Sequence, residues 1–139
     1  MKPTFEKSCG TVPYTKRNGE IYYLLIRSPD GRHCGFPKGH VELGESEEET
    51  ALRETLEETS VAVRIRPGFR HEISYVLSNG VHKTVVYFAA DFAEQTPAHS
   101  EGFEDFEYLI LPFDRAYAAL TFENTREMLR KADKFIASL

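Results

Sequence analysis

The sequence predicts an α/β (α+β) fold in which helices cover a mixed β-sheet. Segments rich in β-forming residues fill the middle of the chain, an acid-rich helical pattern interrupts them at residues 47–59, and a second helical pattern closes the chain. The 139 residues are 41% apolar and contain no Pro/Ser-rich linker. We therefore expect a single domain spanning residues 1–139.

The overall charge limits the classes of partner. The formal net charge is -5 at pH 7, whereas broad nucleic-acid binding depends on basic surface that displaces counterions from phosphates. No apolar run approaches a membrane span, and no signal-peptide pattern opens the chain. We expect a cytoplasmic protein that binds neither nucleic acid nor membrane, as a monomer or a homodimer. Cys9 and Cys34 lack zinc-site spacing and are expected to be reduced thiols.

The first third of the chain predicts a hairpin. Residues 6–15 are expected to form a short, irregular edge strand, because Gly10 and Pro13 interrupt the β pattern. Residues 17–20 contain Asn-Gly, which favours a tight hairpin turn. The continuous apolar run at 21–26 predicts a central strand that is covered on both faces.

Residues 28–38 are expected to be a loop because of their Pro and Gly content. Ser46 is then a plausible N-cap, and Glu49 lies three residues later and completes a capping box. The helix is expected to run from near Glu47 to near Thr59, without the glycine that commonly follows a helix.

Acidic side chains share one face of this helix, which advances about 100° per residue: Glu47, Glu54, Glu57 and Glu58. Leu52, Leu56 and Thr59 fall on the opposite face and are expected to dock on the core, with Ala51 and Thr55 at its flank. Like charges four residues apart destabilise an isolated helix. A positive charge is therefore expected to offset them.

The next segments predict three strands, at 61–66, 69–77 and 81–92. The Asn-Gly turn at 78–80 should pair the second and third strands antiparallel. A long polar loop is expected at 93–106, and loops of this length in compact domains are usually functional or mobile.

The end of the chain predicts a last strand at 108–111, a short helix at 113–120 and a terminal helix. Apolar and small residues recur at helical spacing in this last segment and are expected to pack on the sheet: Phe122, Thr125, Leu129, Ala132, Phe135 and Ile136.

The acidic helix is part of a longer sequence pattern. In order along the chain it consists of Gly39, Glu45, Arg53, Glu54, Glu57, Glu58 and Val61. The spacing resembles the Nudix box, GX5EX7REUXEEXGU, in which U is a bulky aliphatic residue. Every charged position matches, while Thr55 replaces an aliphatic residue and Ser60 replaces the final glycine. Thr55 should be tolerated, and Ser60 leaves the helix exit without its glycine.

The resemblance implies a Nudix-type α/β/α sandwich and hydrolysis of a nucleoside diphosphate linked to another moiety, with Mg²⁺ (or Mn²⁺) as cofactor. The chemistry of the residues agrees with it. A carboxylate cluster can meet a polyphosphate when hard divalent cations lie between them, and Mg²⁺ keeps open positions for water and phosphate oxygens.

The resemblance also assigns roles to individual residues. Glu54, Glu57 and Glu58 become candidate metal ligands or bases, and the main-chain carbonyl of Lys38 becomes a possible further ligand. The expected structural supports of the site are Gly39, Glu45 and Arg53. Arg53 is expected to bridge to Glu49 or Glu57.

Further residues resemble one Nudix subgroup, the asymmetric dinucleoside tetraphosphatases. The similar segments are 35–42 before the helix, Tyr75, and 83–88 after the Asn-Gly turn. Glu104 resembles the additional glutamate that this subgroup uses near its metals, although Glu101 or Asp105 could take that place.

Candidate substrate-binding residues flank the helix. Lys38, His40 and Lys83 could meet the oligophosphate, and Tyr75 and Tyr87 could stack a purine, because every base has a π face. For Tyr87, simple core packing is an equally good interpretation.

The leading hypothesis is metal-dependent hydrolysis of dinucleoside polyphosphates, with diadenosine tetraphosphate giving ATP and AMP. Glu54, Glu58 and Glu104 all remain candidates for the catalytic base. One alternative is a Nudix hydrolase of another nucleotide, such as a nucleoside triphosphate, an ADP-sugar or a capped RNA end. Another is a non-catalytic nucleotide-sensing module, which is disfavoured because the chain keeps every box glutamate.

Overall fold

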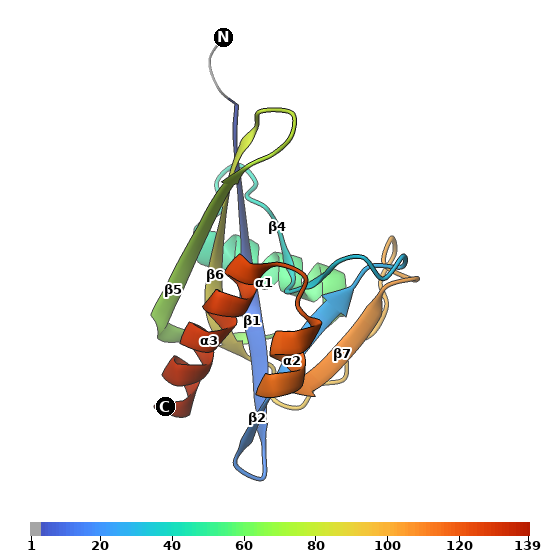
Figure 1. The fold of residues 1–139 in the computed structure, drawn as a ribbon, viewed down its shortest axis with the longest axis vertical. Coiled ribbons are helices and arrows are strands. Elements are labelled where there is room, and N and C mark those ends of the chain that lie inside the picture. Colours follow the sequence, from blue (N-terminus) through green and yellow to red (C-terminus); the bar gives the residue numbers. More distant parts are fainter. Residues whose placement is uncertain (1–3) are drawn as a thin grey trace.

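The fold is a mixed sheet between two helical layers, seen in a computed structural model that describes residues 4–139 (Figure 1). Its strands are β1 (Phe5–Arg17), β2 (Glu20–Arg27), β3 (Cys34–Gly35), β4 (Lys38–His40), β5 (Arg64–Val76), β6 (His82–Asp91) and β7 (Glu107–Pro112). Its helices are α1 (Glu47–Thr59), α2 (Phe113–Ala119) and α3 (Glu123–Ala137). In Figure 1, α1 lies behind the sheet and α2 and α3 lie in front of it. The predicted α/β/α sandwich is confirmed.

Strand β1 lies at the centre of the sheet. It pairs parallel with β6 and antiparallel with β2 and β4. The prediction of a short edge strand at 6–15 was therefore wrong. Pro13 falls between residues 8–10, which pair with β4, and residues 14–17, which pair with β2. A proline fits there because neither of these ladders requires a donor from it.

The two predicted Asn-Gly turns are present. Asn18 and Gly19 have φ values of 50° and 82°, and Gly80 has a φ of 85°. These left-handed conformations match the twist of the flanking strands, which favours tight hairpins. The predicted central strand is also confirmed, since β2 lies between β1 and β7 and also pairs with β3.

Strand β5 is continuous where the sequence predicted two strands. An irregularity between Ile65 and Arg70 shifts the register of β5 against β6. Residues 61–63, which were expected to begin the first of these strands, precede β5. Gly68 lies within this irregularity with a φ of 111°. The Pro-Gly pair therefore bends one strand where it was expected to separate two.

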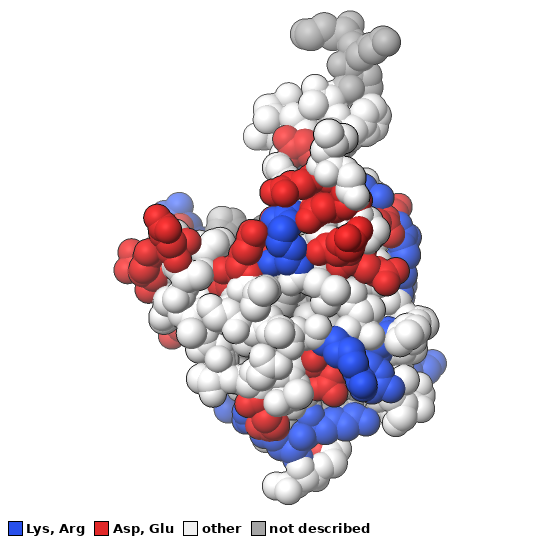
Figure 2. Space-filling model, turned by 180° about the vertical axis from the view of Figure 1, so that it is seen from behind, with Lys and Arg blue, Asp and Glu red and all other residues white. Residues whose placement is uncertain are grey.

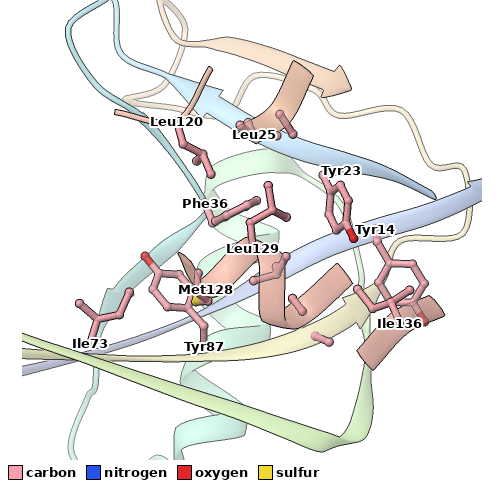
Figure 3. Close-up of a cluster of buried hydrophobic side chains, with 14 of the residues drawn as sticks. Tyr14, Tyr23, Leu25, Phe36, Ile73, Tyr87, Leu120, Met128, Leu129 and Ile136 are labelled. Carbon is pink, nitrogen blue, oxygen red and sulfur yellow. The ribbon is translucent and has the colours of Figure 1, made fainter. Parts of the chain in front are cut away.

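The main core lies between the sheet and the C-terminal helices. Figure 3 shows Met128, Leu129 and Ile136 of α3 packed against the sheet, and all three are fully buried. Thr125, Ala132 and Ile136 are buried as predicted. Phe122 is not, because it precedes the first turn of α3 and is 54% exposed.

Helix α1 docks through small residues. Thr50, Ala51, Thr55 and Thr59 are buried, whereas Leu52 and Leu56 are 38% and 50% exposed. The predicted docking was therefore wrong for Leu52 and Leu56 and right for Thr59, and the helix is turned so that the flanking Ala51 and Thr55 face the sheet. Thr55 lies so close to β1 that its Oγ1 is hydrogen-bonded to Thr11 Oγ1 at 2.8 Å. Side chains as large as leucine would hold the helix further from the sheet.

Both ends of α1 have defined caps. Ser46 accepts a hydrogen bond from the Glu49 backbone, and the Glu49 side chain accepts one from Ser46, as the predicted capping box requires. Ser60 takes the left-handed conformation of the missing glycine, with a φ of 62°. The box departure at this position therefore leaves the helix exit intact.

Cys9 and Cys34 are free thiols, as predicted, and both are buried. Across residues 4–139, no helix combines the length and the apolar character that a membrane span needs.

Candidate active site

Arg53 of α1 ties the helix to the preceding loop through Glu45. Its Nε donates to Glu45 Oε2 at 2.7 Å, and its Nη2 donates to Glu45 Oε1 at 2.9 Å. Glu45 also accepts hydrogen bonds from the Glu42 backbone and the Thr50 hydroxyl. The hydrogen bonds from Arg53 are the largest cause that lowers the pKa of Glu45 to about 2. This geometry suits the supporting role expected of both residues.

The rest of the Arg53 guanidinium reaches the acids of the helix. Its Nη1 lies 2.8 Å from Glu54 Oε1 and 3.3 Å from Glu57 Oε2, and its Nη2 donates to the His40 carbonyl at 3.0 Å. Glu57 is the expected partner, whereas Glu49 is engaged in the helix cap. Figure 2 shows a basic side chain with acidic side chains on either side of it, on the face that carries α1. Arg53 thus supplies the offsetting charge that the acidic helix required.

Glu47 does not pair with Arg53. Its carboxylate lies 2.6 Å from Lys7 Nζ and 2.8 Å from Arg70 Nη2. Hydrogen bonds from Arg70 and then Lys7 lower the pKa of Glu47 to about 2. Glu47 keeps its helical position two turns before Glu54, as predicted, but its carboxylate pairs with cations of the adjacent strands and not with Arg53.

Glycine is required where β4 passes Glu54. A Cβ atom on Gly39 would lie 2.0 Å from Glu54 Cδ, far inside van der Waals contact. The β4 backbone therefore forms one wall of the space that holds the Glu54 carboxylate. This supports the predicted structural role of Gly39.

Glu58 is the most perturbed acid of the helix. Burial, followed by the charge of Glu54, raises the pKa of Glu58 to about 8, although the Lys38 ammonium and a hydrogen bond from the Lys38 backbone lower it. A divalent cation would remove both penalties, because it favours the charged carboxylates. The donor set of Glu54 and Glu58 therefore fits Mg²⁺. Within residues 4–139, however, no three acidic, histidine or cysteine side chains already converge as a metal site would require.

A cavity of about 690 Å³ opens beside Glu58. Four of the predicted site residues line it, namely Lys38, Glu58, Tyr75 and Tyr87. Aromatic residues that sequence reasoning missed supply much of the remaining wall: Phe36, Phe103, Phe106 and Phe122. The signal for two of them was that Phe103 and Phe106 interrupt the otherwise polar loop at 93–106, and Phe36 lies in the 35–42 segment that resembles the tetraphosphatase subgroup.

The predicted cation and ring positions lie on adjacent strands. Tyr75 of β5 is the register partner of Lys83 of β6. Desolvation and then the charge of Lys38 lower the pKa of Lys83, so the two ammonium groups face a common region. Tyr87 is only 4% exposed and lies edge-on to Phe36, with ring centroids 6.4 Å apart. It therefore packs in the core and also borders the cavity.

The side chains of His40 and Glu104 are exposed and do not line the cavity. The His40 side chain is 65% exposed, and its Nε2 is 3.8 Å from Glu6 Oε2. Glu104 is exposed, and its Oε2 accepts a hydrogen bond from the Gly102 backbone at 3.0 Å. Glu101 and Asp105 are exposed in the same loop.

A known protein family has the same spacing of residues along its sequence. The model of the NUDIX domain matches residues 6–132. The chain belongs to the Nudix family. Its Nudix box begins at Gly39 on β4, crosses the loop that contains Glu45 and continues through α1. The box departure at Thr55 is accommodated by the buried hydrogen bond to Thr11.

Related Nudix proteins cover almost the whole chain. It is 33% identical over 142 residues to the bis(5'-nucleosyl)-tetraphosphatase [asymmetrical] of Rattus norvegicus, covering 95% of this chain and 96% of the rat protein. The protein of the same name from Sus scrofa is 33% identical over 143 residues, covering 96% of this chain and 97% of its own. A crystal structure of a C. elegans Ap4A hydrolase binary complex superposes with a TM-score of 0.85 and 28% identity, covering 96% of this chain and 99% of that one.

Proposed function

We propose that this Nudix protein is a metal-dependent hydrolase of dinucleoside polyphosphates, and that diadenosine tetraphosphate gives ATP and AMP. The observation that carries the proposal is the position of Glu58, which belongs to the acidic face of α1 and also lines the aromatic cavity. The names of the rat and pig relatives support the same substrate class.

The cavity suits a nucleoside. Phe36, Tyr75, Phe103, Phe106 and Phe122 present aromatic surface to it, and a purine stacks on such rings whatever its hydrogen-bonding edge. Its volume of about 690 Å³ is in the range of small-molecule pockets. One nucleoside of a dinucleotide would bind here, with its phosphate chain directed toward Glu58.

Two lysines lie near the end of the cavity that contains Glu58, where the phosphate chain would bind. Lys38 borders the cavity, and the lowered pKa of Lys83 reflects desolvation together with the nearby Lys38 ammonium. An oligophosphate would relieve the repulsion between these two cations. His40 extends this basic rim from the exposed end of β4.

Glu54, Glu57, Glu58 and the Lys38 carbonyl are the groups that would hold Mg²⁺, with Mn²⁺ as a substitute. A bound divalent cation supplies Lewis-acid charge to phosphate oxygens and lowers the pKa of water. Gly39 and Arg53 fix the Glu54 carboxylate, and Glu58 lines the cavity in which the nucleotide would bind. Glu54, Glu58 and Glu104 are the candidates to take a proton from the attacking water.

The test is hydrolysis of diadenosine tetraphosphate with Mg²⁺ in ¹⁸O-labelled water, followed by chromatography and mass spectrometry of the products. We expect ATP and AMP in equal amounts, with the label in only one of them. ADP-ribose, a deoxynucleoside triphosphate and a capped dinucleotide complete the substrate panel. A strong preference for one of these three, or near-normal turnover by Glu58→Gln, would refute the proposal.

A further inference from the structure

The last turn of α1 is held from outside the helix. The final carbonyls of any α-helix lack partners within it and need donors from elsewhere. Among residues 4–139, the backbone N–H of Ser60, which has a left-handed conformation, donates to the Leu56 carbonyl alone, at 2.8 Å. The carbonyls of residues 57–59 therefore depend on other parts of the chain, and this turn carries two of the candidate metal ligands.

One segment, residues 98–108, supplies all three donors. Glu57 O accepts from Ser100 Oγ, Glu58 O accepts from Tyr108 Oη at 2.5 Å, and Thr59 O accepts from Ala98 N at 2.9 Å. Two of these donors are side-chain hydroxyls, so each contact can be removed without altering the backbone. We call residues 98–108 the clamp segment.

The clamp segment also forms part of the cavity wall. Phe103 and Phe106 line the cavity, and their ring centroids lie 5.1 Å apart. His99 links the two parts of the segment, because its Nε2 is 2.7 Å from the Phe106 carbonyl and its ring centroid is 4.9 Å from that of Tyr108. The residues that touch a ligand in the cavity and those that hold α1 therefore belong to one bonded unit.

We propose that the clamp segment couples the two halves of the site, so that a nucleoside in the cavity and a divalent cation on α1 bind cooperatively. Tyr108 is the main positioning residue, because its hydroxyl fixes the backbone from which Glu58 projects. The proposal rests on the proposed function, since it takes the cavity as the nucleoside site and α1 as the metal site. Small displacements matter here, because a shift of about 1 Å in a catalytic group can cost about a hundredfold in rate.

Adenosine and Mg²⁺ are the probes that isolate this coupling. Adenosine has no phosphate, so it offers the cation none of the oxygens through which a nucleotide would bind it directly. A coupling between the two must then be carried by the protein, and it must act equally in both directions. Adenosine affinity is measured by calorimetric titration at zero and saturating Mg²⁺.

The decisive variant is Tyr108→Phe, which removes one hydroxyl and keeps the ring. We expect Mg²⁺ to tighten adenosine binding to the unmodified protein by about fivefold or more, and Tyr108→Phe to abolish that gain. With diadenosine tetraphosphate, the variant should show a kcat lower by about tenfold and a higher Mg²⁺ requirement, with KM nearly unchanged. A purely structural role would lower the melting temperature without altering the Mg²⁺ requirement.

The matched control is Tyr22→Phe. Tyr22 donates a long hydrogen bond of 3.4 Å to Glu20 on the surface, so the same chemical change should leave the coupling intact. Ser100→Ala is a second test variant, which removes the clamp at Glu57 and should weaken the coupling without affecting the Tyr108 contact.

Equal adenosine affinity with and without Mg²⁺ in the unmodified protein would overturn the proposal, as would full coupling in both Tyr108→Phe and Ser100→Ala. Failure of adenosine to bind at millimolar concentration would also overturn it. These titrations need no turnover. Absence of hydrolysis would therefore refute the proposed function separately.

Discussion

The hydroxyl of Tyr23 on β2 donates a hydrogen bond of 2.5 Å to Asp133 on α3. Tyr23 is fully buried in the main core (Figure 3). Its hydrogen bond to the half-buried Asp133 therefore joins the sheet to the C-terminal helix. We expect Tyr23→Phe to lower the free energy of unfolding by about 1 kcal/mol. Urea denaturation followed by circular dichroism measures it. Tyr22→Phe on the same strand should change stability by less than about 0.5 kcal/mol, and equal effects in the two variants would contradict the assignment.

The paired hydrogen bonds from Arg53 to Glu45 predict that lysine is a poor substitute. Arg53→Lys keeps the charge but loses the planar fork that reaches Glu45, Glu54 and the His40 carbonyl together. We expect kcat for diadenosine tetraphosphate to fall by about tenfold, with a smaller change in KM. Arg130→Lys is the control, because Arg130 is exposed and pairs with Glu127 on the surface of the same helix. Normal kcat in Arg53→Lys would remove its supporting role.

Glu47 predicts a loss of stability in acid. Its pKa is about 2 in the folded protein and about 4.3 in an unfolded chain. Its contribution is therefore present above about pH 4.3 and is lost as the pH falls toward 2. Glu47→Gln should lower the free energy of unfolding at pH 6. Between pH 5 and 3 this free energy should fall less in the variant than in the unmodified protein, as measured by urea titration. Glu48→Gln, an exposed neighbour, should behave like the unmodified protein.

Substitution of Gly39 is expected to lower activity without lowering stability. In Gly39→Ala the new Cβ would displace the Glu54 carboxylate, which lies 2.0 Å from that position. We expect kcat to fall by about a hundredfold, while thermal unfolding changes little because Glu54 can move toward solvent. Steady-state kinetics beside a melting curve gives both values. An alanine variant with near-normal kcat would mean that the close approach does not position Glu54.

Glu58 predicts that loss of the carboxylate stabilises the metal-free protein. Its folded pKa of about 8 exceeds the unfolded value, so its contribution is favourable at low pH and is lost as the pH rises from about 4 to 8. In EDTA at pH 8.5, Glu58→Gln should therefore melt at a higher temperature than the unmodified protein. Mg²⁺ should raise the melting temperature of the unmodified protein more than that of Glu58→Gln. The reverse order in EDTA would contradict the burial argument.

Local signals in the sequence predicted local structure well. Ser46 and Glu49 marked the start of α1, and two Asn-Gly pairs marked two tight turns. These succeed because a cap or a turn depends on residues only a few positions apart. The Nudix box positions work in the same way, since most of them lie on one helix and the loop that leads into it.

Features that depend on distant segments could not be predicted. The helical periodicity placed Leu52 and Leu56 on the face opposite the acids. Helix α1 lies so close to β1, however, that Thr55 and its small neighbours are buried instead of the leucines. Glu47 pairs with Lys7 and Arg70, which lie on strands remote in the sequence. No local pattern indicated either set of contacts.

The central position of β1 has a consequence for the order of events during synthesis. Residues 5–14 leave the ribosome well before their parallel partner, the stretch from His82 to Asp91. Contacts between distant segments form slowly, because a long stretch of chain must first close into a loop. The middle of the sheet therefore stays open until β6 has been made, and until then one whole edge of β1 is available to any other strand that it meets.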